Sequence, residues 1–356
     1  MCHRINLVIG NHLINDDSDC YVIAEIGHNH QGSLETCKEL FLAAKHAGVS
    51  AVKLQKRDNK TLFTKEAYNK IYDNPNSYGE TYGKHREFLE FGWHEYVALQ
   101  EYAKELGLDF FSTAFDIPSA DFLEKLDMPA YKLASGDLKT IPLLKHIAKF
   151  GKPMIMSTGG ASLDDIRRAY DAVMPINNQI CIMQCTGGYP PEWHELNLMV
   201  IDTLRKEFPD IIIGFSSHDS GIAMAVAGYM LGARIIEKHF TLNRAMKGTD
   251  HAFSLEPSGT TKMVRDLRRL KLALGDGQKI TYTSEKAPIT KMGKSLVAKR
   301  DLPQGHVLTD DDLTMKSPGG GLPPYELENL IGMILTRPIK EDEAFDFARL
   351  AAKKSA

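Results

Sequence analysis

The chain has 356 residues, of which 43% are hydrophobic and 25% are charged. Its 43 Lys and Arg residues are balanced by 46 Asp and Glu residues, and this net charge of −3 argues against a nucleic-acid-binding protein. The longest apolar stretch, near residues 223–236, is broken by Gly228, Gly232 and Arg234, so we expect no membrane-spanning helix. A small soluble substrate is therefore the expected partner.

The first residues and the cysteines indicate the cellular compartment. Residues 1–4 lack the apolar core of a secretion signal, and the five cysteines are odd in number and scattered. We expect reduced thiols in a cytoplasmic protein.

The expected elements begin with a small hairpin over Ile5–Ile14 that turns at Gly10-Asn11 and covers one end of the main domain. Eight apolar or β-branched runs follow, at Tyr21–Gly27, Ala51–Lys56, Asp109–Phe115, Ala130–Ser135, Pro153–Thr158, Ile180–Thr186, Ile211–His218 and Arg234–Thr241. Amphipathic stretches lie between them, such as Ser33–Ala47, Trp93–Leu106, Ile141–Phe150, Ser162–Val173, Leu196–Phe208 and Gly221–Leu231. This alternation predicts an α/β fold, a (β/α)₈ TIM barrel over residues 1–276, with a doubly wound open sheet as the alternative.

Two segments depart from the regular spacing. The connection after the second strand is unusually long and contains Tyr78–Arg86, which we expect to be functional because it follows a strand end. Residues 277–292 are expected to form a polar, irregular linker. Residues 293–356 are expected to form a small module that docks on the barrel or on another subunit, because so few residues are only marginally stable alone.

The carboxyl ends of barrel strands face the active site, and here they are polar. His218 and His239 end neighbouring strands, so their imidazoles are expected to converge and bind a divalent metal that polarises a carbonyl oxygen. Glu25, on the adjoining first strand, is a candidate general base; its structural alternative is an ion pair with Lys53.

A second group of strand-end residues suggests an anion subsite. Lys53 and Lys132 supply charge, and Ser135, Ser157 and Ser216 supply hydroxyl donors. The Gly159-Gly160 turn is expected to bring backbone N–H groups close to the same anion. From the residues alone we expect a metal-dependent barrel enzyme acting on a phosphorylated or carboxylated carbonyl compound.

These strand ends resemble those of the sialic acid synthases. The resemblance rests on residues 24–32 (AEIGHNHQG), 53–55 (KLQ), 131–137 (YKLASGD), 157–159 (STG), 214–218 (GFSSH), 237–240 (EKHF) and 247–251 (KGTDH). The segment from Gly293 to Leu350 resembles the antifreeze-like (SAF) domain of that family.

The resemblance implies condensation of phosphoenolpyruvate with an open-chain N-acylmannosamine or its 6-phosphate, with release of phosphate. It implies a Mn²⁺ or Mg²⁺ ion on His218 and His239, and Glu25 as the catalytic acid/base. It assigns phosphoenolpyruvate binding to Lys53, Thr113, Lys132, Ser135, Ser157 and Ser216, and sugar binding to Gln55, Asp137, Tyr189 and Asp250. It also implies a domain-swapped homodimer.

The identity of the sugar stays open at this point. Asp137 and Gly187 replace a glutamate and an asparagine of some bacterial members, and Ser317 replaces an arginine that reaches the partner's active site there. Lys84, His85 and Arg86 are candidates to bind a sugar 6-phosphate, or they simply solvate a loop. A non-acetylated mannose 6-phosphate, a legionaminate or pseudaminate precursor, and a non-catalytic carbohydrate-binding barrel or ice-binding module are the alternatives.

Overall fold

The computed structural model describes residues 5–352, which divide into two compact units, the first ending at Gly275 and the second beginning at Asp276. None of the helices within this described part is both long and apolar enough to cross a bilayer.

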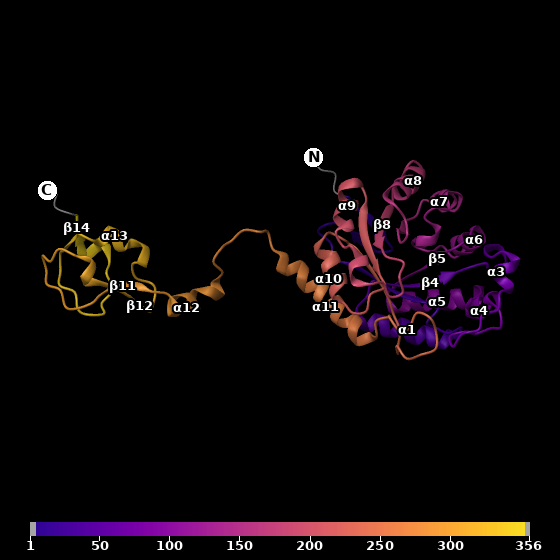
Figure 1. The fold of residues 1–356 in the computed structure, drawn as a ribbon, viewed down its shortest axis with the longest axis horizontal. Helices are drawn as coiled ribbons and strands as arrows, with labels where there is room; N and C mark the ends of the chain where they lie inside the picture. Colours follow the sequence, from indigo (N-terminus) through magenta and orange to yellow (C-terminus); the bar gives the residue numbers. More distant parts are fainter. Residues whose placement is uncertain (1–4, 353–356) are drawn as a thin grey trace. The chain divides into compact units, whose positions relative to one another are not determined.

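The first unit is a closed barrel of eight parallel strands in the order β10-β3-β4-β5-β6-β7-β8-β9, which confirms the predicted TIM barrel (Figure 1). The strands are β3 (Tyr21–Gly27), β4 (Ala51–Lys56), β5 (Asp109–Ala114), β6 (Tyr131–Leu133), β7 (Met154–Ser157), β8 (Ile180–Cys185), β9 (Ile212–Ser217) and β10 (Ile235–His239). Every residue of β3 is buried, as expected of a parallel strand covered on both faces. The open-sheet alternative is therefore wrong.

Helices surround the barrel and connect its strands. They are α1 (Leu34–Ala47), α5 (Trp93–Leu106), α6 (Ile117–Lys125), α7 (Ile141–Ala148), α8 (Leu163–Val173), α9 (Val200–Glu207), α10 (Ala223–Met230) and α11 (Pro257–Leu274). Helix α1 illustrates how the sequence determines where a helix begins and ends. The Ser33 hydroxyl accepts from the Thr36 N–H at the start of α1, and Gly48 ends it in the left-handed conformation, with φ 83°.

The expected hairpin is present as β1 (Leu7–Ile9) and β2 (His12–Ile14), paired antiparallel. Leu7, Ile9 and Ile14 are buried in the barrel's apolar core. His12 Nδ1 lies 2.8 Å from a carboxylate oxygen of Asp109, the first residue of β5. The hairpin therefore covers the amino-terminal end of the barrel and leaves the carboxyl ends of the strands to the site.

The long connection between β4 and α5 includes three short helices. It contains α2 (Asn59–Leu62), α3 (Lys65–Asn69) and α4 (Tyr82–Leu89). The Tyr78 hydroxyl donates to the Lys247 carbonyl at 2.7 Å, and the Gly248 N–H donates to the side chain of Asn76 at 3.1 Å. The insertion is thus fastened to the loop that follows β10.

The second unit has its own apolar core, which includes Leu296, Leu313 and Phe345. Its elements are α12 (Thr283–Met292), β11 (Ser295–Ala298), β12 (Leu313–Lys316), α13 (Leu327–Leu330), β13 (Ile334–Leu335) and β14 (Leu350–Ala351). The prediction of an irregular linker over 277–292 is wrong where α12 forms. The Glu285 carboxylate accepts from the Tyr282 N–H at 2.7 Å and caps the start of this helix.

Candidate active site

A cavity of about 760 Å³ opens at the carboxyl ends of the barrel strands. All thirteen predicted site residues line it: Glu25, Lys53, Gln55, Thr113, Lys132, Ser135, Asp137, Ser157, Tyr189, Ser216, His218, His239 and Asp250. The volume is typical of a small-molecule site.

Strand register brings the chemical groups together. In the parallel pairing, Glu25 of β3 lies beside Lys53 of β4 on one side and His239 of β10 on the other. Thr113 of β5 lies beside Lys132 of β6, and Glu237 of β10 lies beside Ser216 of β9. Residues far apart in the sequence therefore meet because the barrel is closed.

Glu25 is only 2% exposed and forms an ion pair with Lys53, so the structural alternative raised for it is also real. The Gln55 side-chain amide donates to Glu25 Oε1 at 2.7 Å. Burial raises the pKa of Glu25 despite the nearby lysine, with Glu237 adding to the rise. A buried carboxyl group with a raised pKa is suited to carrying a proton to or from a reacting group.

The two lysines are anchored by hydroxyl groups and share one carboxylate. Lys53 donates to the Thr113 hydroxyl at 2.9 Å, and Lys132 donates to the Ser157 hydroxyl at 2.6 Å. Each ammonium lies 3.7 Å from a different oxygen of Glu237. Ammonium and hydroxyl donors are thus concentrated where an anionic substrate would need them.

Glu237 is a site residue that the sequence prediction missed. Its Oε1 accepts from the Ser216 hydroxyl at 3.0 Å. Burial opposes its ionisation, but Lys132 and Lys53 together lower its pKa to about 2, so it stays charged. The available signal was the two-residue period of a strand, which places Glu237 on the same face as His239. We call Glu25, Lys53, Lys132 and Glu237 the barrel group.

The two predicted metal ligands converge, with their ring centroids 5.3 Å apart. His218 donates from Nδ1 to the Thr186 carbonyl at 2.9 Å, which leaves the lone pair on Nε2. Burial and the neighbouring His239 lower the pKa of His218 to about 4, and burial also lowers that of His239. Both rings are thus neutral near pH 7, the form that binds metals.

A divalent metal fits this pair. His239 Nδ1 is buried and has no hydrogen-bond partner among residues 5–352, and Asp250 Oδ2 lies 3.7 Å away. Across that same described range, His, Cys, Asp and Glu side chains form no cluster of three or more that could hold a metal. Two imidazoles alone leave coordination positions open for substrate oxygens, as a catalytic metal requires.

The Gly159-Gly160 turn does not serve the anion subsite as predicted. The Gly159 N–H donates to the Ser135 hydroxyl at 2.9 Å, and neither glycine lines the cavity. A Cβ at Gly159 would lie 2.9 Å from that hydroxyl oxygen. The glycine is therefore needed for the close approach of Ser135, not for that of a ligand.

The insertion contributes to the cavity, but not through all the predicted residues. Lys84 is exposed and pairs with Glu80 at 3.3 Å, and the buried His85 accepts from the Tyr78 N–H at 3.1 Å. Neither lines the cavity, so both are wrong as phosphate candidates, whereas Arg86 does line it.

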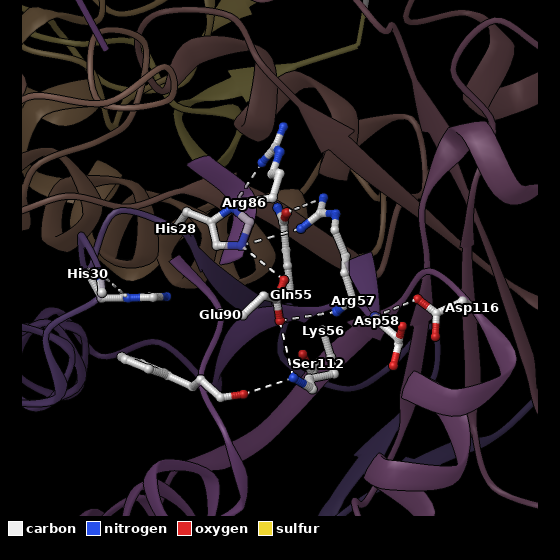
Figure 2. Close-up of polar contacts among 12 residues, drawn as sticks. His28, His30, Gln55, Lys56, Arg57, Asp58, Arg86, Glu90, Ser112 and Asp116 are labelled. Carbon is white, nitrogen blue, oxygen red and sulfur yellow. Dashed lines mark hydrogen bonds and ion pairs between the residues drawn. The ribbon is translucent and has the colours of Figure 1, made fainter. Parts of the chain in front are cut away.

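Arg57, which the sequence prediction missed, lies beside Arg86 (Figure 2). Its position two residues after Gln55 continues the alternation of Lys53 and Gln55 and could have revealed it. Tyr82 of α4 also lines this part of the cavity. We call Arg57, Tyr82 and Arg86 the outer group.

Comparison with known proteins agrees with this geometry. The family model described as NeuB matches residues 40–279, about two thirds of the chain. The chain belongs to the NeuB family. A SAF domain model matches residues 293–351, so the predicted antifreeze-like module is also confirmed.

Relatives of this NeuB family protein include named synthases. It is 41% identical over 325 residues to the human N-acetylneuraminate-9-phosphate synthase, covering 91% of this chain and 90% of that one. It is 34% identical over 323 residues to the N,N'-diacetyllegionaminic acid synthase of Legionella pneumophila, covering 89% and 90% of the two chains.

Solved structures agree with these relatives. The N-acetylneuraminic acid synthetase of Leptospira borgpetersenii superposes with a TM-score of 0.70 at 29% identity, covering 81% of this chain and 96% of that one. The predicted sialic acid synthase family and the prediction of a synthase-type enzyme are confirmed.

Proposed function

We propose that this enzyme condenses phosphoenolpyruvate with an open-chain N-acylmannosamine to give a nine-carbon 2-keto acid and phosphate. The observation that carries the proposal is the barrel group, in which two lysines and two glutamates meet beside a pair of neutral histidines in one cavity. The named synthases among its relatives support the same reaction class.

Phosphoenolpyruvate is assigned to the lysine end. Lys53 and Lys132 would bind its carboxylate and phosphate oxygens, and the hydroxyls of Thr113, Ser135, Ser157 and Ser216 would add hydrogen bonds. Both ammonium groups already bond hydroxyl oxygens at 2.9 Å and 2.6 Å, so they are oriented before the substrate arrives. The sugar aldehyde is assigned to the space between Glu25 and the histidines, beside Gln55, Asp137, Tyr189 and Asp250.

The reaction has two stages, and both require proton transfers. C3 of phosphoenolpyruvate attacks the aldehyde carbon, and the aldehyde oxygen takes a proton. Water then adds to C2 and releases a proton. The C2–O bond to phosphate breaks as the C2 hydroxyl loses its proton to become the ketone, and the departing phosphate takes up a proton, so the two protons released from water equal the two taken up by the aldehyde oxygen and the phosphate. Glu25, with its raised pKa, would deliver and accept protons at these oxygens.

His218 and His239 would hold Mn²⁺ or Mg²⁺. When bound, such an ion polarises the aldehyde oxygen. The chain's own contribution is to keep both rings neutral and, through the Thr186 carbonyl, to aim His218 Nε2 away from its backbone anchor.

The proposal is tested by product formation from phosphoenolpyruvate and Mn²⁺, with an EDTA control. N-acetylmannosamine, its 6-phosphate, mannose 6-phosphate and the diacetamido precursors of legionaminate and pseudaminate are offered in parallel. Because contaminating phosphatases release phosphate, the keto acid is identified by mass. Metal-dependent product from one sugar would support the proposal, and no product from any of them would overturn it.

A homodimer that exchanges its SAF module, and a cytoplasmic location, stay predictions. Light scattering of the full chain measures its mass in solution and so tests whether it is a dimer.

A further inference from the structure

We infer that the outer group is a second anion subsite, which binds a phosphate group at the far end of the sugar. The inference rests on the proposed function, because it assigns the class of acceptor sugar. The subsite is separate from the lysine end of the cavity, which is assigned to phosphoenolpyruvate.

The two guanidinium groups lack the partners that buried arginines require. Arg57 is only 9% exposed and Arg86 is half-buried, yet neither guanidinium group forms an ion pair with a carboxylate among residues 5–352. The nearby Glu90 carboxylate lies 3.2 Å from the Lys56 ammonium and contacts Arg57 only through the backbone N–H. Buried charges are normally paired, so these cations await an anion.

His28 faces both guanidinium groups, and the Glu90 carboxylate oxygen beside its Nε2 lies 3.8 Å away, beyond hydrogen-bond distance (Figure 2). His28 Nε2 lies 3.3 Å from Arg57 NH1, and its Nδ1 lies 3.2 Å from Arg86 NH1. Burial and the two arginines lower the pKa of His28, so the ring is neutral, with one N–H and one lone pair. Since guanidinium groups only donate, one of these contacts sets a donor against a donor. Oxygens of a bound anion would supply the missing acceptors.

The arginines are held in place without using up their donors. The Arg57 guanidinium stacks on the Phe115 ring at 3.6 Å, and its NH2 donates to Gln55 Oε1 at 2.7 Å. Arg86 donates from Nε and NH2 to the Tyr82 hydroxyl, at 3.1 Å and 2.9 Å. Each guanidinium has five N–H donors, so each keeps donors for a ligand. Two preoriented forks suit the several oxygens of a phosphate dianion.

The position of the subsite matches the far end of an open-chain sugar. The Gln55 amide donates to Glu25 at one end and accepts from Arg57 at the other, both at 2.7 Å. Arg57 is therefore one amide group away from the proposed acid/base. A six-carbon chain whose aldehyde lies at Glu25 is long enough to place a terminal phosphate at the outer group.

The test compares kcat/KM for N-acetylmannosamine and its 6-phosphate in the wild type and in R57Q/R86Q. We expect the wild type to prefer the phosphorylated sugar by roughly 100-fold, since charge-assisted hydrogen bonds to two guanidiniums are lost with the free sugar. In the double variant this preference should disappear, because KM for the phosphorylated sugar rises far more than KM for the free sugar. R57K/R86K should restore part of the preference, because lysine keeps the charge but not the fork.

Lys84→Gln is the matched control, because it removes a positive charge from the same insertion outside the cavity. This substitution should leave kcat/KM for both sugars unchanged. Equal losses with both sugars in R57Q/R86Q, or a wild type without preference, would overturn the inference and leave the proposed function intact.

If the wild type makes no keto acid from any sugar, the proposed function fails, and calorimetry decides on the subsite. Binding of N-acetylmannosamine 6-phosphate that is lost in R57Q/R86Q would support it. Binding that is absent in the wild type, or unchanged in the variant, would overturn it.

Discussion

The two ends of the cavity differ in how their charges are balanced. The barrel group has two lysines and two glutamates in mutual contact, whereas the two arginines of the outer group have no carboxylate partner among residues 5–352. An anion that binds the barrel group must compete with the glutamates that already contact the lysines. An anion that binds the outer group gives the two arginines the negatively charged partner that they lack. The first arrangement suits proton transfer and chemistry, and the second suits recognition.

The largest expected effect is on metal-dependent turnover. EDTA should abolish product formation, and His218→Asn should weaken the apparent metal affinity by at least roughly 100-fold, since a direct ligand matters more than its supporting shell. Asparagine can still donate to the Thr186 carbonyl, so the fold around this position is kept. His94→Asn, at an exposed position of α5, is the control. Equal metal affinity in the wild type and His218→Asn would remove His218 from the metal site.

Glu25→Gln tests the chemical role of the barrel group. Glutamine keeps the contact to Gln55 but cannot exchange a proton, so kcat should fall by roughly 10² to 10⁴ while phosphoenolpyruvate still binds. Steady-state kinetics measures kcat, and calorimetry measures the binding of phosphoenolpyruvate. Glu80→Gln, on the exposed insertion, is the control. Turnover within threefold of the wild type would show that Glu25 has only its ion pair with Lys53.

Charge removal should lower the free energy of unfolding at the barrel group but not at the outer group. Glu237→Gln leaves two buried lysines with less compensation and should lower the free energy of unfolding by roughly 3 kcal/mol at pH 7. Because the folded pKa of Glu237 is lowered to about 2, this difference should be complete above its unfolded value, near 4.5, and disappear as the pH falls toward 2. Arg57→Gln should leave stability unchanged or raise it. Urea unfolding at several pH values measures both, and equal destabilisation by the two variants would contradict the comparison.

A smaller effect is expected in the pH dependence of KM for the sugar. Burial raises the pKa of Asp137 to about 6, so this carboxylate becomes protonated as the pH falls below that value. If Asp137 accepts hydrogen bonds from sugar hydroxyls, KM for the sugar should rise by roughly tenfold between pH 7 and pH 5. Asp137→Asn should lose this dependence while KM for phosphoenolpyruvate is unaffected. An unchanged pH profile in the variant would separate Asp137 from sugar binding.

The sequence predicted the barrel group better than the outer group, for a physical reason. Strand periodicity and the carboxyl-end rule place Glu25, Lys53 and His239 with no knowledge of loops. The same periodicity also places Arg57 and Glu237 on the cavity face, yet the sequence prediction missed both. The direction of Arg86, by contrast, depends on how the insertion packs, and that packing is fixed by contacts such as the one from Tyr78 to Lys247.

Some loop residues were placed only through the resemblance. Nothing in local pattern brings Tyr189 or Asp250 to the cavity, because both lie in connections after strands. Gly159 shows the opposite failure. A glycine before a helix matched an anion-binding turn, yet its N–H bonds Ser135, a contact 24 residues away that local sequence does not encode.

The most direct test of the two-ended cavity is bisubstrate kinetics on Lys132→Gln and R57Q/R86Q. Glutamine at position 132 can still bond Ser157, so the change removes mainly charge. The account predicts that Lys132→Gln raises KM for phosphoenolpyruvate alone, and that R57Q/R86Q raises KM for the phosphorylated sugar alone. If both KM values move together in either protein, the division of the cavity into a phosphoenolpyruvate end and a sugar-phosphate end is contradicted.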